Sequence, residues 1–283
     1  NIYKAKGTEK SFRNFIRCFG IDEEVVKLNT YANNYTYEIK ENLRYTTSKA
    51  NTVNFYNTSS FGATIYQTTS SLAGSKNYIP GSNCTKTTFQ ADVFVPKHAE
   101  ENSRHFFDVS FVTASVFGCH TPASLNAADT SWATNDVANF SVDVIRSAKN
   151  EAYFRLKSSN ARIPQLTSSV FPILEADRRW NLAVRIAHQS RPFGNLVSGA
   201  ADSPYDVVFS GLSYISDEIE DQFSVSGSMT KAHGDEFHQA NKRIYAGAHR
   251  INFTGSLVNQ TDLKIASIRY WQDFLSDEDL KPH

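Results

Sequence analysis

Short segments in which apolar and polar residues alternate run through most of this 283-residue chain. The clearest is Trp180–Ile186, where an apolar residue larger than alanine occupies every second position. The same alternation recurs in Phe89–Val95, Phe140–Val144 and Tyr205–Phe209, and turns rich in Gly, Asn, Ser and Pro separate these segments. Because successive side chains of a strand point to opposite faces, the pattern predicts many antiparallel strands. The chain is long enough to bury the core of one large all-β sandwich.

The first 48 residues follow a helical period instead. Thr8 is a suitable N-cap, and Gly20 is a suitable C-terminal stop. Between them one helix face is apolar and consists of Phe12, Phe15, Ile16 and Phe19. A strand-like stretch, Val25–Tyr31, follows. We therefore predict a helix-strand connector over residues 1–48 and a sandwich domain over residues 49–283, in which we expect no second helix of comparable length.

Charge and cysteine content exclude several classes of protein. The 29 basic residues balance the 29 acidic ones, so the chain has no basic footprint for nucleic acid or an anionic membrane. No apolar run is long enough to cross a bilayer. The three cysteines, Cys18, Cys84 and Cys119, are far apart and form no CxxC pair, which argues against a zinc site or a redox dithiol. We expect them to be buried free thiols.

The end of the chain predicts a strand followed by the start of a helix. Leu263–Trp271 is strand-like, and Ser276 with Asp279 three residues later fits the capping box of a short helix. Trp180 and Trp271 both lie within strand patterns, and large aromatic side chains are usually buried. We therefore expect both of these tryptophans in the core.

Three regions, taken in order, carry a family resemblance. Asp177–Val184 opens an apolar strand with a tryptophan, Lys242–Ala248 and Asn252–Ser256 place glycines at turns, and Ile265–Glu278 ends in Leu-Ser-Asp-Glu. In this arrangement the chain resembles concanavalin A-like, laminin G-like modules over about residues 50–283. The resemblance implies an all-β fold, an antiparallel two-sheet jelly-roll sandwich with Trp180 between the sheets.

Two further stretches resemble modules of very long virion proteins of tailed phages, especially marine ones. These are Lys6-Gly7-Thr8 with Arg17–Ile21, ahead of the sandwich, and Phe117–Thr121 with the loop that follows. The resemblance implies a non-enzymatic structural or adhesion module of a virion surface or tail, with weak multivalent binding of host-surface glycans. We expect a homo-oligomer whose partners are other virion subunits or neighbouring modules, with no nucleic acid and no membrane insertion. Two alternatives stay open: a glycan-active depolymerase domain, and a secreted or cell-surface laminin G-like adhesion domain.

No catalytic residue is predicted. Glucanases of the same fold use a Glu-x-Asp-x-x-Glu strand that places carboxylates on one face, and the chain lacks this pattern. Its densest acidic stretch, Asp217–Asp221, is expected to be a solvated turn before the strand at Phe223. His233 and His238 form an HxxxxH spacing, but with no helix expected there and no third ligand this does not indicate zinc.

We also predict no cofactor and no metal. The resemblance implies Ca²⁺ at the rim of the sandwich as the alternative, with Asp129, Asn135 and Asp136 as oxygen ligands. These three residues are dispersed along their loop and follow no EF-hand-like spacing. Ordinary capping of loop backbone by Asx side chains is therefore the preferred interpretation.

One loop offers the chemistry that a sugar requires. A saccharide needs an aromatic plane for its apolar face and planar polar groups for its hydroxyls. Trp132 lies in a long interior loop beside Thr130, Asn135 and Asp136. These four residues are the candidate carbohydrate-binding site. The alternative is that Trp132 only pins its own loop to the sandwich.

Overall fold

The computed structural model describes residues 2–21, 51–55, 58–68, 85–96, 112–126, 128–148, 151–172, 178–189, 204–215 and 218–281. The chain divides into two compact units, Asn1–Lys49 and Ala50–His283. The described part of the first unit contains a 3-10 turn, η1 (Tyr3–Ala5), and a helix, α1 (Glu9–Arg17). No helix in the described ranges is long and apolar enough to cross a membrane.

Helix α1 forms where the apolar period predicted it. Thr8 occupies the N-cap position with an extended backbone, but its hydroxyl donates to the Ala5 carbonyl (2.7 Å) and accepts no bond from the helix. Gly20 has a φ of +74°, a conformation that favours glycine, and it follows the last helical turn as expected. The strand predicted at Val25–Tyr31 lies outside the described residues.

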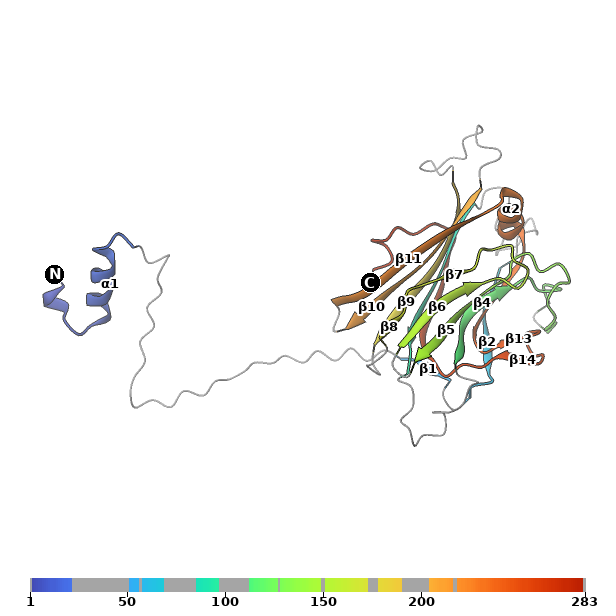
Figure 1. Cartoon of the computed structure of the whole chain (residues 1–283), viewed down its shortest axis with the longest axis horizontal. Helices are drawn as coiled ribbons and strands as arrows, with labels where there is room; N and C mark the ends of the chain where they lie inside the picture. Colours follow the sequence, from blue (N-terminus) through green and yellow to red (C-terminus); the bar gives the residue numbers. More distant parts are fainter. Residues whose placement is uncertain are drawn as a thin grey trace. The chain divides into compact units, whose positions relative to one another are not determined.

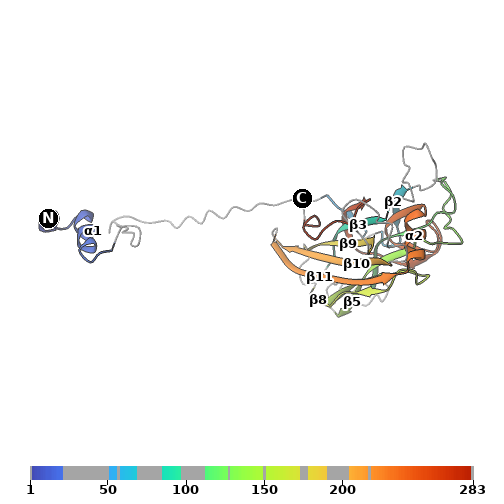
Figure 2. The same cartoon turned by 90° about the horizontal axis from the view of Figure 1, so that it is seen from above.

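The second unit is a sandwich of two antiparallel sheets (Figure 1). The six-stranded sheet has the order β1-β15-β3-β9-β10-β11. Its strands are β1 (Val53–Asn54), β15 (Lys264–Trp271), β3 (Lys86–Phe94), β9 (Arg179–His188), β10 (Tyr205–Ile215) and β11 (Glu218–Met229). Figure 2 shows β9, β10 and β11 side by side in this layer.

The seven-stranded sheet has the order β2-β12-β4-β5-β6-β7, with β8 also paired to β6. Its strands are β2 (Gly62–Thr68), β12 (Lys242–Gly247), β4 (Thr113–His120), β5 (Phe140–Ala148), β6 (Glu151–Lys157), β7 (Leu166–Thr167) and β8 (Phe171–Pro172). A separate two-stranded ribbon joins β13 (His249–Arg250) to β14 (Leu257–Asn259). The chain crosses between the sheets from β1 to β2, β2 to β3, β3 to β4, β8 to β9 and β11 to β12, and it returns from β12 to β15 through the β13–β14 ribbon. These crossings confirm the predicted antiparallel jelly-roll sandwich.

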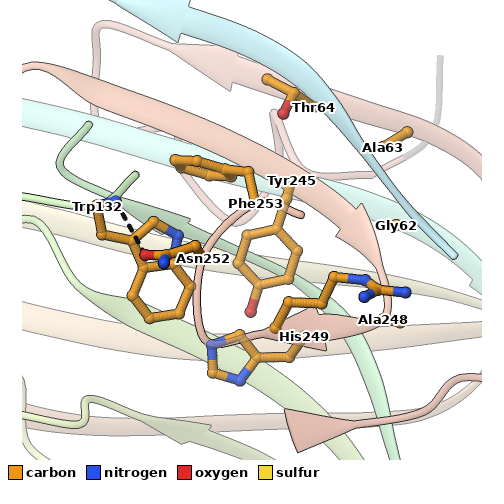
Figure 3. A pocket seen from close by; sticks show the side chains of 10 residues that line it. Gly62, Ala63, Thr64, Trp132, Tyr245, Ala248, His249, Asn252 and Phe253 are labelled. Atoms are coloured by element: carbon orange, nitrogen blue, oxygen red, sulfur yellow. Dashed lines mark hydrogen bonds between the residues drawn. The ribbon is translucent and has the colours of Figure 1, made fainter. Parts of the chain in front are cut away.

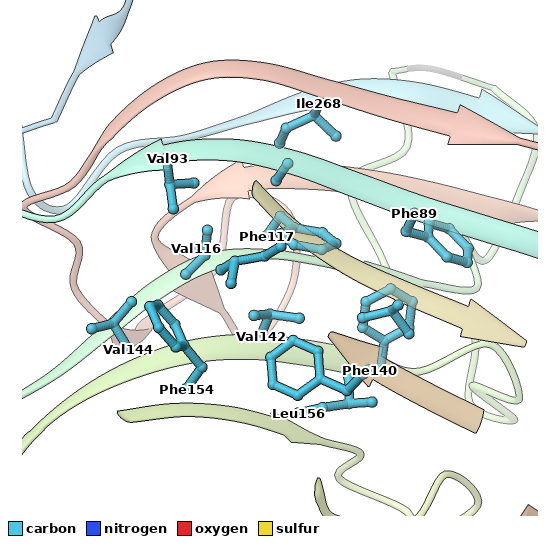
Figure 4. Packing of buried hydrophobic residues seen from close by; sticks show 14 of the residues in the cluster. Phe89, Val93, Val116, Phe117, Phe140, Val142, Val144, Phe154, Leu156 and Ile268 are labelled. Carbon is cyan, nitrogen blue, oxygen red and sulfur yellow. The ribbon is translucent and has the colours of Figure 1, made fainter. Parts of the chain in front are cut away.

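The core lies between the two sheets and follows the two-residue period of the sequence. Inward side chains from both layers interdigitate (Figure 4), and they include Phe89, Val93, Phe117, Phe140, Val142, Val144, Phe154 and Leu156. Trp180 is fully buried, as predicted, and its ring lies 4.7 Å from that of Phe154 and 5.0 Å from that of Phe171. Phe55 is also buried, whereas Val53, two residues earlier, is 61% exposed.

A second helix, α2 (Lys231–Gln239), was not expected, and this prediction was wrong. The segment has weak apolar periodicity, and Gly234 at its centre lowers helix propensity. Thr230 caps the helix by accepting from the His233 amide (3.3 Å). Gly234 is required by packing, since a Cβ there would lie 2.1 Å from the Tyr205 ring. Tertiary contact with β10 therefore decides this helix more than local preference does.

The C-terminal strand was predicted within one residue, but the helix after it is a single turn. Ser276 and Asp279 form the reciprocal bonds of a capping box, with the Asp279 amide 3.2 Å from Ser276 Oγ and the Ser276 amide 3.1 Å from the Asp279 carboxylate. Leu280 then turns inward and is buried. Trp271 was expected in the core, yet it is 41% exposed. It shares its face of β15 with Arg269, because Ile268 and Tyr270 occupy the inner face.

The acidic stretch Asp217–Asp221 was also misassigned. Asp217 lies outside the described residues, but β11 begins at Glu218, so most of the stretch is strand. Asp221 lies opposite Ser213 of β10 and forms an ion pair with the buried Arg178. The exposed Glu220 carboxylate lies 3.0 Å from the same guanidinium. These ion pairs therefore connect β11 to Arg178, directly before β9.

Candidate functional site

Strand register brings two aromatic residues together on the outer face of the seven-stranded sheet. Strand β4 ends with Cys119 and His120, whose side chains lie on opposite faces, so Cys119 is in the core and His120 on the outer face. On the neighbouring strand β12, Tyr245 pairs with Gly118. A Cβ at Gly118 would lie 2.7 Å from Tyr245 Oη, so only glycine leaves room for the phenol. The rings of His120 and Tyr245 are 5.6 Å apart and nearly parallel.

The loop after β4 folds back over this face through one carboxylate. Asp136 Oδ1 accepts from the Thr121 amide (2.6 Å), and Oδ2 accepts from His120 Nδ1 and Asn139 Nδ2 (both 2.7 Å). A bridge between Pro122 and Trp132 closes the loop. The Trp132 ring consequently stacks on His120, with centroids 3.4 Å apart and planes 13° apart.

The ribbon of β13 and β14 adds a second histidine. His249 Nε2 lies 3.1 Å from His120 Nε2, and the two rings are nearly parallel. Because Asp136 accepts the Nδ1 proton of His120, His120 Nε2 is an acceptor, and the proton between the rings belongs to His249 Nε2. His249 Nδ1 is then a bare acceptor. It is buried and has no hydrogen-bond partner among the described residues.

Burial keeps both imidazoles neutral. The pKa of His249 is lowered to about 3, chiefly by desolvation and to a smaller extent by the neighbouring His120 and Lys157. Desolvation also lowers the pKa of His120, against an opposing effect of Asp136. Burial alone would raise the pKa of Asp136, but the hydrogen bonds from His120, Thr121 and Asn139 hold it below its usual value. At neutral pH the cluster therefore contains one carboxylate and two uncharged histidines.

A small pocket opens beside this cluster (Figure 3). Trp132, Tyr245, His249, Asn252 and Phe253 line one side, and residues 62–64 at the start of β2 line the other. Its volume of 20 Å³ holds a water molecule but no sugar ring. Trp132 Nε1 is buried at this pocket and, like His249 Nδ1, lacks a partner within the described ranges. Two residues that line the pocket thus each carry a buried polar atom without a partner among the described residues, beside an aromatic surface.

The structure separates the four predicted site residues into different roles. Trp132 lines the pocket and also pins its loop by stacking. Thr130 ties the loop to the ribbon, since its carbonyl accepts from the Phe253 amide (3.0 Å). Asn135 accepts a hydrogen bond from Arg162 (3.5 Å) and does not line the pocket. Asp136 does not line it either, and its carboxylate is bound to His120 Nδ1.

Sequence reasoning missed the ring and amide side chains that line the pocket beside Trp132, which are Tyr245, His249, Asn252 and Phe253, and it missed His120, on which Trp132 stacks. Of these residues, only Tyr245 could have been assigned to an outer face from the sequence, because it alternates with the apolar Ile244 and Ala246 in β12. No local sequence pattern indicated that β13 lies next to the loop before β5. Asp129 accepts from the Ser131 amide (2.9 Å), an Asx turn that fits the predicted loop capping. In the described part of the chain no three His, Cys, Asp or Glu side chains converge on a metal position.

The sequence matches no model of a known protein family, and no curated protein matches it. Among solved structures, a native heptameric SAP-like pentraxin from Limulus polyphemus matches with a TM-score of 0.35 and 10% identity, over 70% of this chain and 69% of that one. An alginate lyase from Pseudomonas aeruginosa matches with a TM-score of 0.33 and 4% identity, over 67% of this chain and 65% of that one. The fold assignment rests on the two sheets described above.

Proposed function

We propose that the sandwich is a non-enzymatic saccharide-binding module whose site is the Trp132 pocket. The observation that carries this proposal is the pair of unused polar atoms, Trp132 Nε1 and His249 Nδ1, beside a stacked aromatic surface. A sugar hydroxyl both donates and accepts, which is the chemistry that an indole N–H and an unprotonated imidazole nitrogen together require. The sugar ring then lies across the mouth of the pocket, against Phe253 and the edge of the indole.

Binding at one such site is weak. Each neutral hydrogen bond contributes about 0.5–1.5 kcal/mol, and a shallow pocket adds little buried area. Display of many copies raises avidity by about 10²–10⁴-fold without new contacts. Weak single sites therefore suit a repeated module of a large phage-like virion protein that adheres to host-surface glycans, which is the wider role we propose. The residues that support this context are Lys6-Gly7-Thr8 with Arg17–Ile21 and Phe117–Thr121, through their resemblance to such proteins.

The chemistry of the cluster favours recognition over turnover. A general base works best when its pKa lies near the operating pH, and His249, with a pKa of about 3, is a weak base at pH 7. Burial raises the pKa of Tyr245 well above its usual value, so its phenolate is inaccessible near neutral pH. The depolymerase alternative draws on one observation, the hydrogen-bonded chain Asp136–His120–His249 next to a tyrosine.

A glycan array tests the proposal. The probes are neutral and acidic bacterial-surface polysaccharides, and the protein is displayed multivalently as the wild type, Trp132→Ala, Trp132→Phe or the control Tyr3→Ala. Tyr3 is 93% exposed and is not among the residues that line the pocket, so its truncation removes an aromatic ring that is not part of the site.

We expect Trp132→Ala to lose binding, Trp132→Phe to retain part of it, and Tyr3→Ala to match the wild type. Equal binding by the wild type and Trp132→Ala, or no binding by the wild type to any glycan, would refute the proposal. Shortening of a bound polysaccharide over hours, abolished in a His249→Asn variant, would favour the depolymerase instead.

A further inference from the structure

The outer face of the opposite, six-stranded sheet carries a second ordered group of polar side chains. Asp92 of β3 is only 1% exposed although it points away from the core. Its Oδ1 accepts from Asn181 Nδ2 (2.8 Å), and its Oδ2 accepts from Arg179 (2.8 Å) and from Ser267 Oγ (2.7 Å). Arg269 also reaches Oδ2, at 3.3 Å. One buried carboxylate therefore fixes two arginines from β9 and β15.

Gln90, two residues earlier on β3, extends this order to a tryptophan. Its Nε2 donates to Asn181 Oδ1 (3.0 Å), and its Oε1 accepts from Arg269 and from Trp271 Nε1 (both 3.4 Å). Arg269 thus lies between Trp271, with which it shares Gln90, and Arg179, with which it shares Asp92. The side chains of Trp271, Arg269 and Arg179 therefore form one row on the outer face. The buried side chains of Gln90 and Asp92 hold this row in place through hydrogen bonds.

The row stays accessible, and its charge is unbalanced. The exposed fraction is 31% for the Arg179 side chain, 38% for the Arg269 side chain and 41% for Trp271. Two guanidinium groups face one carboxylate, which leaves an excess of one positive charge. Arg179 Nε and the hydroxyl of its cross-strand neighbour Tyr214 are buried and have no hydrogen-bond partner in the described ranges.

Another part of this face is covered by the chain itself. Beyond Trp271 the C-terminal segment folds over β9, where Arg185 donates to the Leu275 carbonyl (3.0 Å) and lies under the Phe274 ring at 5.0 Å. The Thr88 hydroxyl donates to the Asp273 carbonyl (2.7 Å). The segment therefore covers the Thr88 and Arg185 part of the sheet, whereas the side chains of Trp271, Arg269 and Arg179 are 31–41% exposed.

We propose that this row is a second binding site, specific for saccharides that carry an anionic group. Guanidinium groups held in fixed positions accept carboxylate or sulfate oxygens through paired, charge-assisted hydrogen bonds. The adjacent indole provides a plane for the apolar face of the sugar ring. Buried anchors reduce the conformational entropy lost on binding, since the three side chains are already ordered. The module would then bind glycans on both of its faces, and this second site does not depend on the Trp132 pocket.

Calorimetric titration with defined oligosaccharides tests this site. The probes are a uronate oligosaccharide, a sulfated oligosaccharide and an uncharged oligosaccharide of the same length. The variants are Arg269→Gln, Trp271→Ala and Trp271→Phe, with Arg13→Gln as the control. Arg13 is an exposed arginine paired with Glu9 in α1, so the control makes the same charge change elsewhere.

We expect the acidic probes to bind the wild type at least about tenfold more tightly than the uncharged one. Arg269→Gln and Trp271→Ala should each weaken acidic-probe binding by about tenfold, while Trp271→Phe and Arg13→Gln retain it. Stronger binding of the uronate or of the sulfated probe identifies the anionic group, and added salt should weaken either.

Three outcomes would overturn the second site: unchanged affinity of Arg269→Gln, equal binding of acidic and uncharged probes, or no acidic-probe binding by the wild type. Loss of acidic-probe binding in Trp132→Ala but not in Arg269→Gln would place that ligand in the first pocket instead. Urea unfolding of each variant checks that the fold is kept. Trp271→Phe conserves the ring, so it separates a lost contact from a lost fold.

Discussion

Acid sensitivity of the folded state is the most direct test of the buried histidine pair. His249 is 8% exposed, and its pKa in the folded protein is about 3, against an ordinary value near 6.5. The unfolded chain therefore binds more protons than the folded one between these two values, and stability falls as pH drops through that window. At pH 5 the unfolded imidazole is mostly protonated while the folded one is not. The resulting loss is about 2 kcal/mol relative to pH 7.

The perturbation is His249→Asn, which removes the titrating ring and keeps a polar side chain. Urea unfolding at pH 7 and pH 5 gives the free energy of unfolding of each protein at each pH. We expect the loss between the two pH values to be about 2 kcal/mol smaller in the variant than in the wild type. Carboxylates contribute little over this range, because their ordinary pKa values lie near 4.

A matched control is His233→Asn, which removes a partly exposed histidine and keeps His249. Because this change leaves the contact between His120 and His249 intact, it should retain the part of the pH dependence that comes from that pair. His238 is a second buried histidine with a pKa of about 3, lowered chiefly by desolvation. The double variant of His249 and His238 should therefore lose about twice as much of the pH dependence as His249→Asn alone. If His249→Asn and the wild type lose the same free energy between pH 7 and pH 5, the account of the neutral pair is wrong.

Two substitutions test the packing of the sandwich. Trp180→Ala removes a fully buried ring that contacts Phe154 and Phe171. Urea titration should show a free energy of unfolding about 3–5 kcal/mol lower than that of the wild type. A loss below about 1 kcal/mol would contradict the place of Trp180 in the core. Gly234→Ala should raise the helix propensity of α2. It should nevertheless destabilise the protein by about 1–3 kcal/mol, because the new Cβ would lie 2.1 Å from the Tyr205 ring. A thermal midpoint above that of the wild type would show that this contact relaxes freely.

Local alternation was enough to predict β3, β5, β9, β10 and β15 and their buried side chains. Phe89, Val142 and Trp180 are buried because strand geometry sends alternate side chains to opposite faces, whatever the strand pairs with. The same rule, applied from Ile268, would have placed Trp271 outside. The error arose from treating a large aromatic residue as a core residue by type alone. Helix α2 escaped prediction because its support comes from packing against Tyr205 and not from its own sequence.

The candidate sites depend on tertiary structure. In the sequence, His120 and His249 are 129 positions apart, and a β4–β12 register that pairs Tyr245 with Gly118 brings their strands together. The Trp271 row likewise combines β3, β9 and β15. The sequence determined the sandwich, since period and turn chemistry are local properties of the chain. Only the folded structure decided which polar groups meet, because strand order and register are fixed by pairings between distant segments.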